Sequence, residues 1–275
     1  MTIAATDRVQ APFGARRGRL TGTERYGAYT VLRCTDLAGP RPQAGQFYML
    51  SAAERWGGGE GERPFLPRAF SVLRAPEVGD ELQFLIEDVG PGTKRLCELP
   101  AGAELSLVGP LGIGFPAPRP GRRAVLAGGG VGIAPLAILS DQLAEEMSVL
   151  LGFRDAAHAR GAELIGGARV ATDDGSVGHH GLVTDLLQEE CDRDLRLEVY
   201  ACGPPPMLEA VRALCATTNP PTPAHLALES GMACGFGACF GCVVPTTDGY
   251  IRICVDGPVV DAARLQSALT PGAGH

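Results

Sequence analysis

The pattern of hydrophobic residues changes near residue 120, and this change limits the folds open to the chain. Between residues 16 and 115, short segments rich in Val, Leu, Phe and Tyr are separated by Gly, Pro and Asp. Such segments predict strands, which we expect over residues 29–35, 46–52, 70–75, 81–89 and 104–109. Short strands at this spacing predict a small antiparallel barrel or sandwich. The glycine-rich stretch 54–63 is expected to be an exposed loop.

Beyond a proline-rich linker at 116–123, apolar strands alternate with helical periodicity. A short strand at 124–127 leads through glycines into an amphipathic helix, and further strands are expected at 147–153 and 195–203. Helices are expected at 181–190 and 205–218. This alternation predicts a doubly wound parallel sheet covered by helices on both faces. A small β-like piece at 250–260 follows. We therefore expect an all-β antiparallel barrel domain at 1–118, an α/β domain at 119–223 and a small C-terminal segment at 224–275.

Composition excludes several classes of protein. The 275 residues carry a net charge of −7 and show no basic stripe, which argues against a nucleic-acid surface. The N-terminus lacks the apolar core of a signal peptide, and no window approaches the roughly 18 apolar residues of a membrane helix. A cytoplasmic protein is therefore expected. In a reducing compartment, its nine cysteines do not indicate a disulfide scaffold. Five of them have apolar or helical neighbours and are expected to be small buried residues.

The other four cysteines have the spacing of a metal site. Cys234, Cys239 and Cys242 form C-x4-C-x2-C, and Cys254 follows after eleven more residues. Structural zinc sites generally use two close cysteine pairs, whereas this spacing is that of plant-type [2Fe–2S] clusters. The glycines and alanine between the thiols leave room for a loop to wrap a cluster and aim backbone N–H groups at its sulfurs. A [2Fe–2S] cluster is the preferred interpretation, with zinc and free thiols as alternatives.

Two motifs lie where strands are expected to end. Glycines fill the turn after the strand at 124–127, at Gly128, Gly129, Gly130 and Gly132. Such a turn lets the backbone approach a phosphate at the start of a helix. The second motif is CGPPPM at 202–207, which begins at the end of the strand expected over 195–203. It contains Cys202, Gly203 and Met207. Open α/β sheets bind ligands at this end of their strands. Each motif alone is also compatible with a tight turn that binds nothing.

Together with the barrel before them, these motifs resemble the ferredoxin–NADP reductase superfamily, in which a flavin-binding barrel precedes a nicotinamide-binding domain. The segment RAFS matches the flavin motif of that superfamily, and GPGT at 90–93 matches its phosphate-binding turn. The resemblance implies that Arg68 pairs with the flavin pyrophosphate, that Phe70 lies against the ring system and that Ser71 sits near its reactive nitrogen. The full set of flavin contacts implied is Arg68, Ala69, Phe70, Ser71, Leu85, Ile86, Glu87, Gly92 and Thr93. Gly128, Gly129, Gly130, Gly132, Cys202, Gly203 and Met207 are implied to bind the dinucleotide.

The cysteine segment narrows the resemblance. The motif at 232–243, followed by C-x-D-G-P-V at 254–259, resembles the electron-transfer subunits of type B dihydroorotate dehydrogenases. This resemblance implies an oxidoreductase subunit of pyrimidine biosynthesis with FAD, a [2Fe–2S] cluster and NAD as cofactors. Electrons would come from a partner subunit that contains FMN and oxidises dihydroorotate, in a heterotetramer of two catalytic and two electron-transfer subunits. They would cross the cluster one at a time, collect on FAD and leave as hydride.

This mechanism requires no acid–base dyad, and the sequence contains no convincing one. Cys202 is implied to lie near the nicotinamide, although a packed thiol at a strand end is an equal alternative. His179 and His180 are expected in a surface loop. For the choice of dinucleotide, Arg154 suits a 2′-phosphate and Asp155 suits a 2′-hydroxyl. The residues alone therefore leave NAD and NADP open.

A docking face for the partner is expected beside the thiolates, at Phe240, Val243 and Val244. Two other functions remain open. One is a subunit of a sulfhydrogenase or of a bifurcating ferredoxin–NADP reductase, which has the same parts but another partner. The other is a zinc-containing interaction module without electron transfer.

Overall fold

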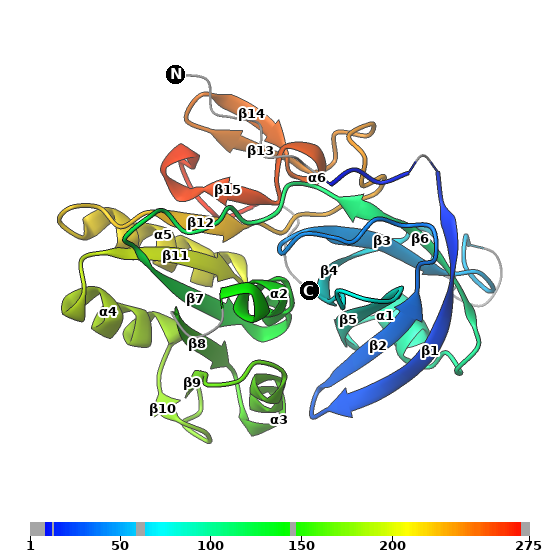
Figure 1. Cartoon of the computed structure of the whole chain (residues 1–275), viewed down its shortest axis with the longest axis horizontal. Helices are drawn as coiled ribbons and strands as arrows, with labels where there is room; N and C mark the ends of the chain where they lie inside the picture. Colours follow the sequence, from blue (N-terminus) through cyan, green and yellow to red (C-terminus); the bar gives the residue numbers. More distant parts are fainter. Residues whose placement is uncertain (1–8, 13, 59–63, 144–146, 271–275) are drawn as a thin grey trace.

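A computed structural model of the chain describes residues 9–12, 14–58, 64–143 and 147–270. A β-barrel lies beside a sheet with its helices, and a small two-stranded ribbon lies near the junction of the two (Figure 1). Part of the expected glycine-rich loop, residues 59–63, lies outside the described residues.

Six antiparallel strands close into the barrel in the order β1-β2-β5-β4-β3-β6. Their bounds are β1 Arg16–Tyr26, β2 Tyr29–Thr35, β3 Phe47–Ala52, β4 Arg68–Arg74, β5 Glu81–Glu87 and β6 Glu104–Leu111. Helix α1, Pro91–Cys97, connects β5 to β6. This confirms the barrel rather than the sandwich, and closure leaves no open sheet edge. Strand β1 was not among the expected strands because it buries only Gly18 and Leu20 and is otherwise polar.

Aromatic and aliphatic side chains fill the barrel. Tyr48 and Phe84 meet edge to face with ring centroids 5.6 Å apart, a favourable aromatic geometry. One charged pair is also buried in this region. The Nε of Arg16 donates to Oδ1 of Asp36 at 2.8 Å, and its Nη2 donates to the carbonyl of Gly109 at 2.7 Å. The barrel therefore combines an apolar core with one buried ion pair between β1 and the end of β2.

The second body is a seven-stranded sheet in the order β10-β9-β8-β7-β11-β12-β15. Its strands are β7 Arg123–Gly129, β8 Met147–Phe153, β9 Arg169–Thr172, β10 His179–His180, β11 Leu197–Cys202, β12 Ala224–Ala227 and β15 Val259–Asp261. All neighbours are parallel except β12 and β15. The expected parallel sheet is confirmed, and its central strands are buried on both faces. The histidine pair expected in a loop instead forms the exposed edge strand β10.

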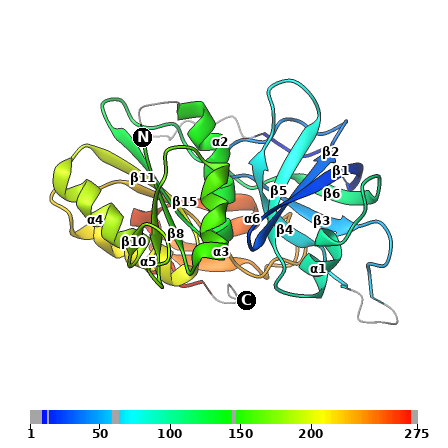
Figure 2. The ribbon, with the colours of Figure 1, turned by 90° about the horizontal axis from the view of Figure 1, so that it is seen from below.

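Helix α2 lies between the sheet and the barrel (Figure 2). The sheet's other helices are α3 Ala156–Ala159, α4 Val183–Arg193 and α5 Pro205–Thr217, and one-turn 3-10 helices span Gly130–Ile133, Arg160–Leu164 and Ala262–Arg264. We expected α2, Ala134–Leu143, to be amphipathic, but every residue from Ala134 to Ser140 is buried. The barrel covers the face that would otherwise meet solvent, so the helix is apolar nearly all round.

The C-terminal part belongs partly to the sheet. Strands β12 and β15 extend it, while β13 Val243–Thr246 and β14 Gly249–Arg252 form the separate ribbon. The expected β-like piece at 250–260 is wrong in its middle, where Ile253–Asp256 forms helix α6.

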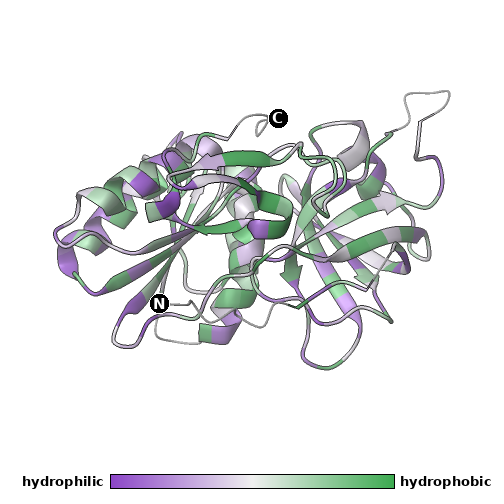
Figure 3. Ribbon diagram, turned by 90° about the horizontal axis from the view of Figure 1, so that it is seen from above, coloured by the Kyte–Doolittle hydropathy of each residue, from purple (hydrophilic) through white to green (hydrophobic). Residues whose placement is uncertain are grey.

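Hydrophobic residues lie along the strands of both bodies, and hydrophilic ones line the outer faces of the helices (Figure 3).

Four of the five dispersed cysteines, Cys34, Cys191, Cys202 and Cys215, are buried, and Cys97 is half-buried. Burial raises the pKa of Cys34 and of Cys215 to about 12, which keeps these thiols protonated. The expectation of small buried residues is confirmed for the four buried cysteines and not for Cys97. Within the described ranges, no helix is both long enough and apolar enough to span a bilayer.

Candidate functional site

A cavity of about 540 Å³ lies where the barrel, the sheet and the C-terminal segment meet. Its volume is within the range usual for cofactor sites. Eight of the nine residues expected to contact flavin line it: Arg68, Ala69, Phe70, Ser71, Leu85, Glu87, Gly92 and Thr93. The ninth, Ile86, is fully buried in the barrel. The alternation of side chains along β5 explains this difference, because successive residues point to opposite faces of a strand.

The two flavin motifs touch at one side of this cavity. A Cβ placed on Gly92 would lie 2.8 Å from Nε of Arg68, so only glycine leaves room for the guanidinium there. Nη1 of Arg68 donates to the carbonyl of Leu66 at 2.7 Å. The hydroxyl of Thr93 accepts from the backbone N–H of Gly90 at 3.0 Å and so holds the turn. A cation and open backbone at one end of an apolar cavity suit a ligand with phosphates and a ring system.

The opposite wall comes from a segment that was not expected to contribute. Leu228, Glu229, Ser230, Gly231 and Met232 all line the cavity. They follow β12, at the carboxyl edge of the sheet, where ligands bind in folds of this type. The position of this segment just after a strand was the available signal, but β12 was not recognised because it has only four residues.

Glu229 is the acidic group of that wall. Its side chain is open to the cavity, while protein surrounds it on the other sides, and this desolvation raises the pKa of its carboxyl. Cys202 lies close enough for the charge of Glu229 to affect it. Burial first, and then Glu229, raises the pKa of the Cys202 thiol well above its ordinary value. Cys202 is 2% exposed at the end of β11 and does not line the cavity.

The glycine turn and the Cys202–Met207 motif pack directly against each other. A Cβ on Gly132 would lie 2.5 Å from the backbone carbonyl of Cys202, and one on Gly129 would lie 2.4 Å from Sδ of Met207. The turn also brings Val131 and Ala134 to the cavity wall. The two motifs therefore form one surface at the carboxyl ends of β7 and β11, next to the flavin motifs.

The four cysteines expected to bind metal come together as two pairs. Cys242 and Cys254 have their Sγ atoms 3.1 Å apart in the interior. Nearer the surface, the backbone N–H of Cys239 donates to Sγ of Cys234 at 3.5 Å. Among the described residues, no three Cys, His, Asp or Glu side chains surround a single point as ligands of one ion do. Two pairs of thiols are the donor set of a cluster with two irons.

Backbone N–H groups surround the outer thiols. The N–H of Gly241 donates to Sγ of Cys239 at 3.4 Å. Burial opposes ionisation of Cys234, but N–H groups of Cys239 and Phe236 point at its sulfur, and its pKa falls to about 7. Burial, and then the thiol of Cys242, raises the pKa of Cys254 to about 12. Bound cationic iron would be needed to hold Cys254 as a thiolate.

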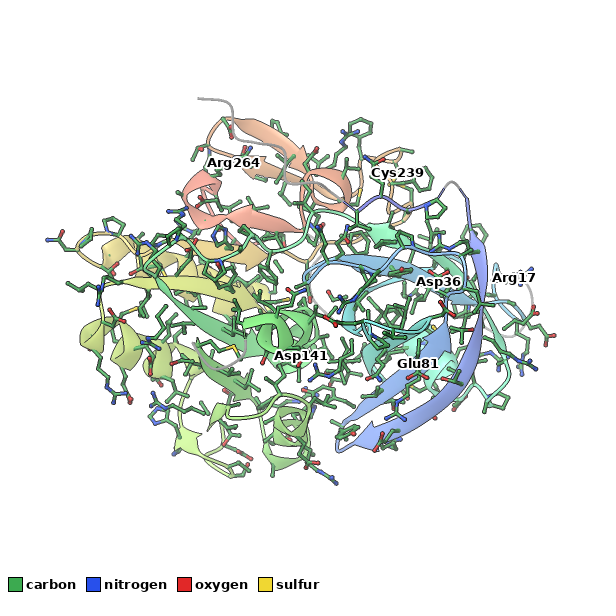
Figure 4. All side chains as sticks on the ribbon, viewed as in Figure 1. Arg17, Asp36, Glu81, Asp141, Cys239 and Arg264 are labelled. Atoms are coloured by element: carbon green, nitrogen blue, oxygen red, sulfur yellow. The ribbon has the colours of Figure 1, made fainter. Side chains whose placement is uncertain are left out.

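The loop between the first two cysteines depends on its glycines. Gly235 and Gly237 have φ angles of 77° and 86°, in the left-handed region that favours glycine. A Cβ on Gly235 would lie 2.5 Å from Cγ of Met49 in the barrel, so the loop packs closely on β3. Cys239 lies on this loop at the periphery of the molecule and is exposed (Figure 4).

The expected apolar docking face needs a correction. Val244 is 2% exposed and packs in the core beneath the ribbon, and Val243 is only half-buried. Both lie on β13, where alternate side chains point inward. Phe240 is 63% exposed as expected, and Phe236, which was not anticipated, is exposed to the same extent. The exposed apolar side chains beside Cys239 are therefore the two phenylalanines.

Comparisons with known proteins agree with this geometry. A protein-family model described as the iron-sulfur cluster binding domain of dihydroorotate dehydrogenase B matches residues 229–266. Solved structures share the fold, among them two reductases. The NADH-dependent reduced ferredoxin-NADP oxidoreductase has a TM-score of 0.75 at 22% identity and covers 93% of this chain and 92% of its own. The ferredoxin reductase in carbazole 1,9a-dioxygenase has a TM-score of 0.62 at 22% identity, with 74% and 65% covered.

Curated relatives match nearly the whole chain. The dihydroorotate dehydrogenase B (NAD(+)) electron transfer subunit of Bacillus velezensis is 36% identical over 249 residues, which cover 86% of this chain and 92% of that protein. The subunit of the same name from Caldanaerobacter subterraneus subsp. tengcongensis is 34% identical over 256 residues, with 90% and 97% covered. The chain therefore belongs to the family of electron transfer subunits of dihydroorotate dehydrogenase B.

Proposed function

We propose that this protein transfers electrons from a dihydroorotate-oxidising partner subunit to NAD+ in pyrimidine biosynthesis, by means of a [2Fe–2S] cluster and FAD. Both sites suit these groups. The cavity is lined by the cationic Arg68, by Gly92, which leaves room for the guanidinium, and by apolar side chains. The four cysteines form two pairs of thiols. When bound, the flavin exchanges hydride with nicotinamide and single electrons with the cluster.

One observation carries the proposal. The segment from Leu228 to Met232 forms a wall of the cavity, and Cys234 follows it after a single residue. The candidate cluster and the candidate flavin site are thus joined by the same short stretch of backbone. Gly235 packs on Met49 of β3, which further ties the cluster loop to the barrel. Electron transfer needs cofactors that lie close together, and this shared segment supports such a placement.

Each part of the chain has a proposed role. Residues 1–118 bind FAD, residues 119–223 bind NAD, and residues 224–275 hold the cluster while adding two strands to the nucleotide sheet. Arg68 neutralises the pyrophosphate, with Gly92 leaving room for it, and Phe70 and Ser71 line the ring site. Ile86 supports β5 from the barrel side. The packed turns at 128–132 and 202–207 receive the dinucleotide, and Cys234, Cys239, Cys242 and Cys254 ligate the cluster.

The partner is proposed to be an FMN-containing catalytic subunit, assembled as two catalytic and two electron-transfer subunits. Phe236 and Phe240 support this proposal, since both are 63% exposed beside Cys239, the outermost ligand. Exposed aromatic residues are common anchors of protein interfaces. The free thiols suit a reducing compartment, and we propose the cytoplasm.

Reconstitution tests the function. The purified chain, loaded anaerobically with iron, sulfide and FAD, is mixed with a type B dihydroorotate dehydrogenase catalytic subunit, and NADH formation from dihydroorotate is followed. We expect NADH formation that requires both proteins and is abolished by Cys239→Ser, while Cys97→Ser retains it. A loaded chain that oxidises NADH with an artificial acceptor but never accepts electrons from the catalytic subunit would contradict the assigned partner. Light scattering of the complex tests the two-plus-two stoichiometry.

A further inference from the structure

Two residues of opposite charge follow β8, at a position that distinguishes one dinucleotide from another in many α/β sheets. β7 is the first strand of the nucleotide sheet and β8 is the next along the chain and its neighbour. In such sheets an acidic residue after the second strand accepts from a ribose 2′-hydroxyl, and an arginine there accommodates a 2′-phosphate. Phe153 ends β8, and Arg154 and Asp155 follow. Both kinds of residue are present, so their contacts must decide which of them acts.

Arg154 is held by a residue of the barrel. Its Nη2 lies 2.5 Å from Oε1 of Glu87, the last residue of β5. Its Nε donates to Nε2 of His158 at 2.9 Å. The other ring nitrogen of His158, Nδ1, lies 2.7 Å from Oδ1 of Asp155. With a proton on Nδ1, His158 donates to Asp155 while its Nε2 accepts from Arg154. The same Nε2 lies 3.3 Å from Oε1 of Glu87, so Arg154, His158 and Glu87 form one cluster.

Asp155 keeps one carboxylate oxygen available. Its Oδ1 accepts from the backbone N–H of His158 at 3.0 Å and caps α3. Its Oδ2 lies 4.0 Å from Nε of Arg154, a distant ion pair, and the side chain is 40% exposed. Hydrogen bonds from His158 lower the pKa of Asp155, so the carboxylate stays charged. A charged oxygen beside the strand end suits a ribose hydroxyl and repels a phosphate.

The neighbouring loop adds more negative charge. The backbone N–H of Asp173 donates to the carbonyl of Phe153 at 3.0 Å, and that of Asp174 to the carbonyl of Arg154 at 3.3 Å. These two acidic residues therefore run alongside the end of β8. Together with Glu87 and Asp155, these residues place four carboxylates in this region, against the guanidinium of Arg154. Glu87 already pairs with that guanidinium and offsets its charge.

We propose that Glu87 of the flavin barrel sets the preference for NAD over NADP by holding Arg154 away from the 2′ position of the dinucleotide. This inference rests on the proposed function, since it concerns the same dinucleotide. It makes Glu87 a specificity-determining residue that acts through Arg154 across the interface between the barrel and the nucleotide sheet. Because Glu87 also lines the flavin cavity, one side chain contacts both cofactor regions.

Calorimetric titration of the full-length, flavin-loaded protein tests the inference without the partner. The probes are 5′-AMP and adenosine 2′,5′-bisphosphate, which differ only in the 2′-phosphate. Glu87→Gln should free Arg154 and raise affinity for the bisphosphate relative to 5′-AMP about tenfold, the effect of one charge-assisted hydrogen bond. Glu87→Gln combined with Arg154→Gln should lose that gain. Glu24→Gln, which removes an exposed carboxylate paired with Arg33 on the barrel, is the matched control and should change neither affinity.

Arg154→Gln alone gives a second test that leaves the flavin cavity intact. Because Arg154 is already engaged, its loss should change the affinity for the bisphosphate less than about twofold, well under one charge-assisted hydrogen bond. A tenfold loss would show that Arg154 binds the 2′-phosphate in the native protein and would overturn the inference. An unchanged ratio in Glu87→Gln, or a gain that persists in the double variant, would also overturn it. Failure of the native protein to bind either nucleotide would contradict the proposed function as well.

Discussion

The guanidinium carbon of Arg252 lies 5.6 Å from the centroid of the Phe240 ring. Phe240 occupies the left-handed region at φ 59°, which is uncommon for a residue other than glycine. Nη1 of Arg252 also donates to the carbonyl of Gly237 at 3.2 Å. Arg252 ends β14, two residues before Cys254. One side chain thus joins the loop of Cys239 to the segment of Cys254.

Replacing Arg252 should therefore loosen the cluster loop. Arg252→Gln removes a cation–π contact, a hydrogen bond and a partly exposed ion pair with Asp256, together about 1–2 kcal/mol. The rate at which the loaded protein loses its visible iron–sulfur absorbance in air should rise about fivefold to thirtyfold. The matched control is Arg264→Gln, in the same C-terminal segment, where Arg264 pairs with exposed Asp248. Equal rates in the two variants would show that Arg252 does not stabilise the loop.

A second prediction concerns the packed turns. Gly132→Ala places a Cβ against the backbone of Cys202 at 2.5 Å, where nothing flexible can move aside. The two turns must separate, so affinity for NADH should fall at least about tenfold, as in other cases where a small displacement disturbs a site. Gly166→Ala is the control, since its Cβ would meet nothing within 4 Å. Binding is measured by fluorescence titration, and an unchanged affinity in Gly132→Ala would mean that the turns do not shape the dinucleotide site.

Sequence reasoning recovered the parts of this protein that are local in the chain. The cysteine spacing, the RAFS and GPGT motifs and the glycine turn each lie within a few residues, and the structure brings them to one region. The contribution of Glu229 and its neighbours was missed because it depends on β12, whose four residues carry no periodicity. The burial of Val244 was missed because the pairing of β13 with β14 sets which face points inward. The burial of α2 from Ala134 to Ser140 could be predicted only with knowledge of how the barrel packs on the sheet.

The buried ion pair in the barrel gives a stability prediction. The side chains of Asp36 and Arg16 are 3% and 10% exposed. Asp36→Ala leaves a buried arginine without its partner, which should lower the free energy of unfolding by about 3 kcal/mol or more. Glu104→Ala removes the partner of Arg17 from an ion pair about two-thirds exposed, and should cost less than about 1 kcal/mol. Thermal unfolding measures both, and similar losses would show that burial does not decide the effect.

The raised pKa of Glu229 predicts that the stability of the protein depends on pH. Because burial raises its pKa in the folded protein above the ordinary 4.5, the folded state favours the protonated carboxyl. Its contribution to stability is fully present below the unfolded pKa and is lost as pH rises through the folded pKa. The melting temperature of flavin-free Glu229→Gln should therefore rise relative to the native protein as the pH increases above about 4.5. Glu77→Gln, at a carboxylate 87% exposed, controls for the lost charge. A difference that stays constant with pH would contradict this assignment.

Electron paramagnetic resonance of the anaerobically prepared, dithionite-reduced protein tests the central claim most directly. If Cys234, Cys239, Cys242 and Cys254 hold a [2Fe–2S] cluster, the native chain should contain two irons and show the signal of one unpaired electron. Cys239→Ser should lose or alter that signal, and Cys97→Ser should keep it. A native chain that binds one zinc ion and gives no signal after reduction would contradict the account.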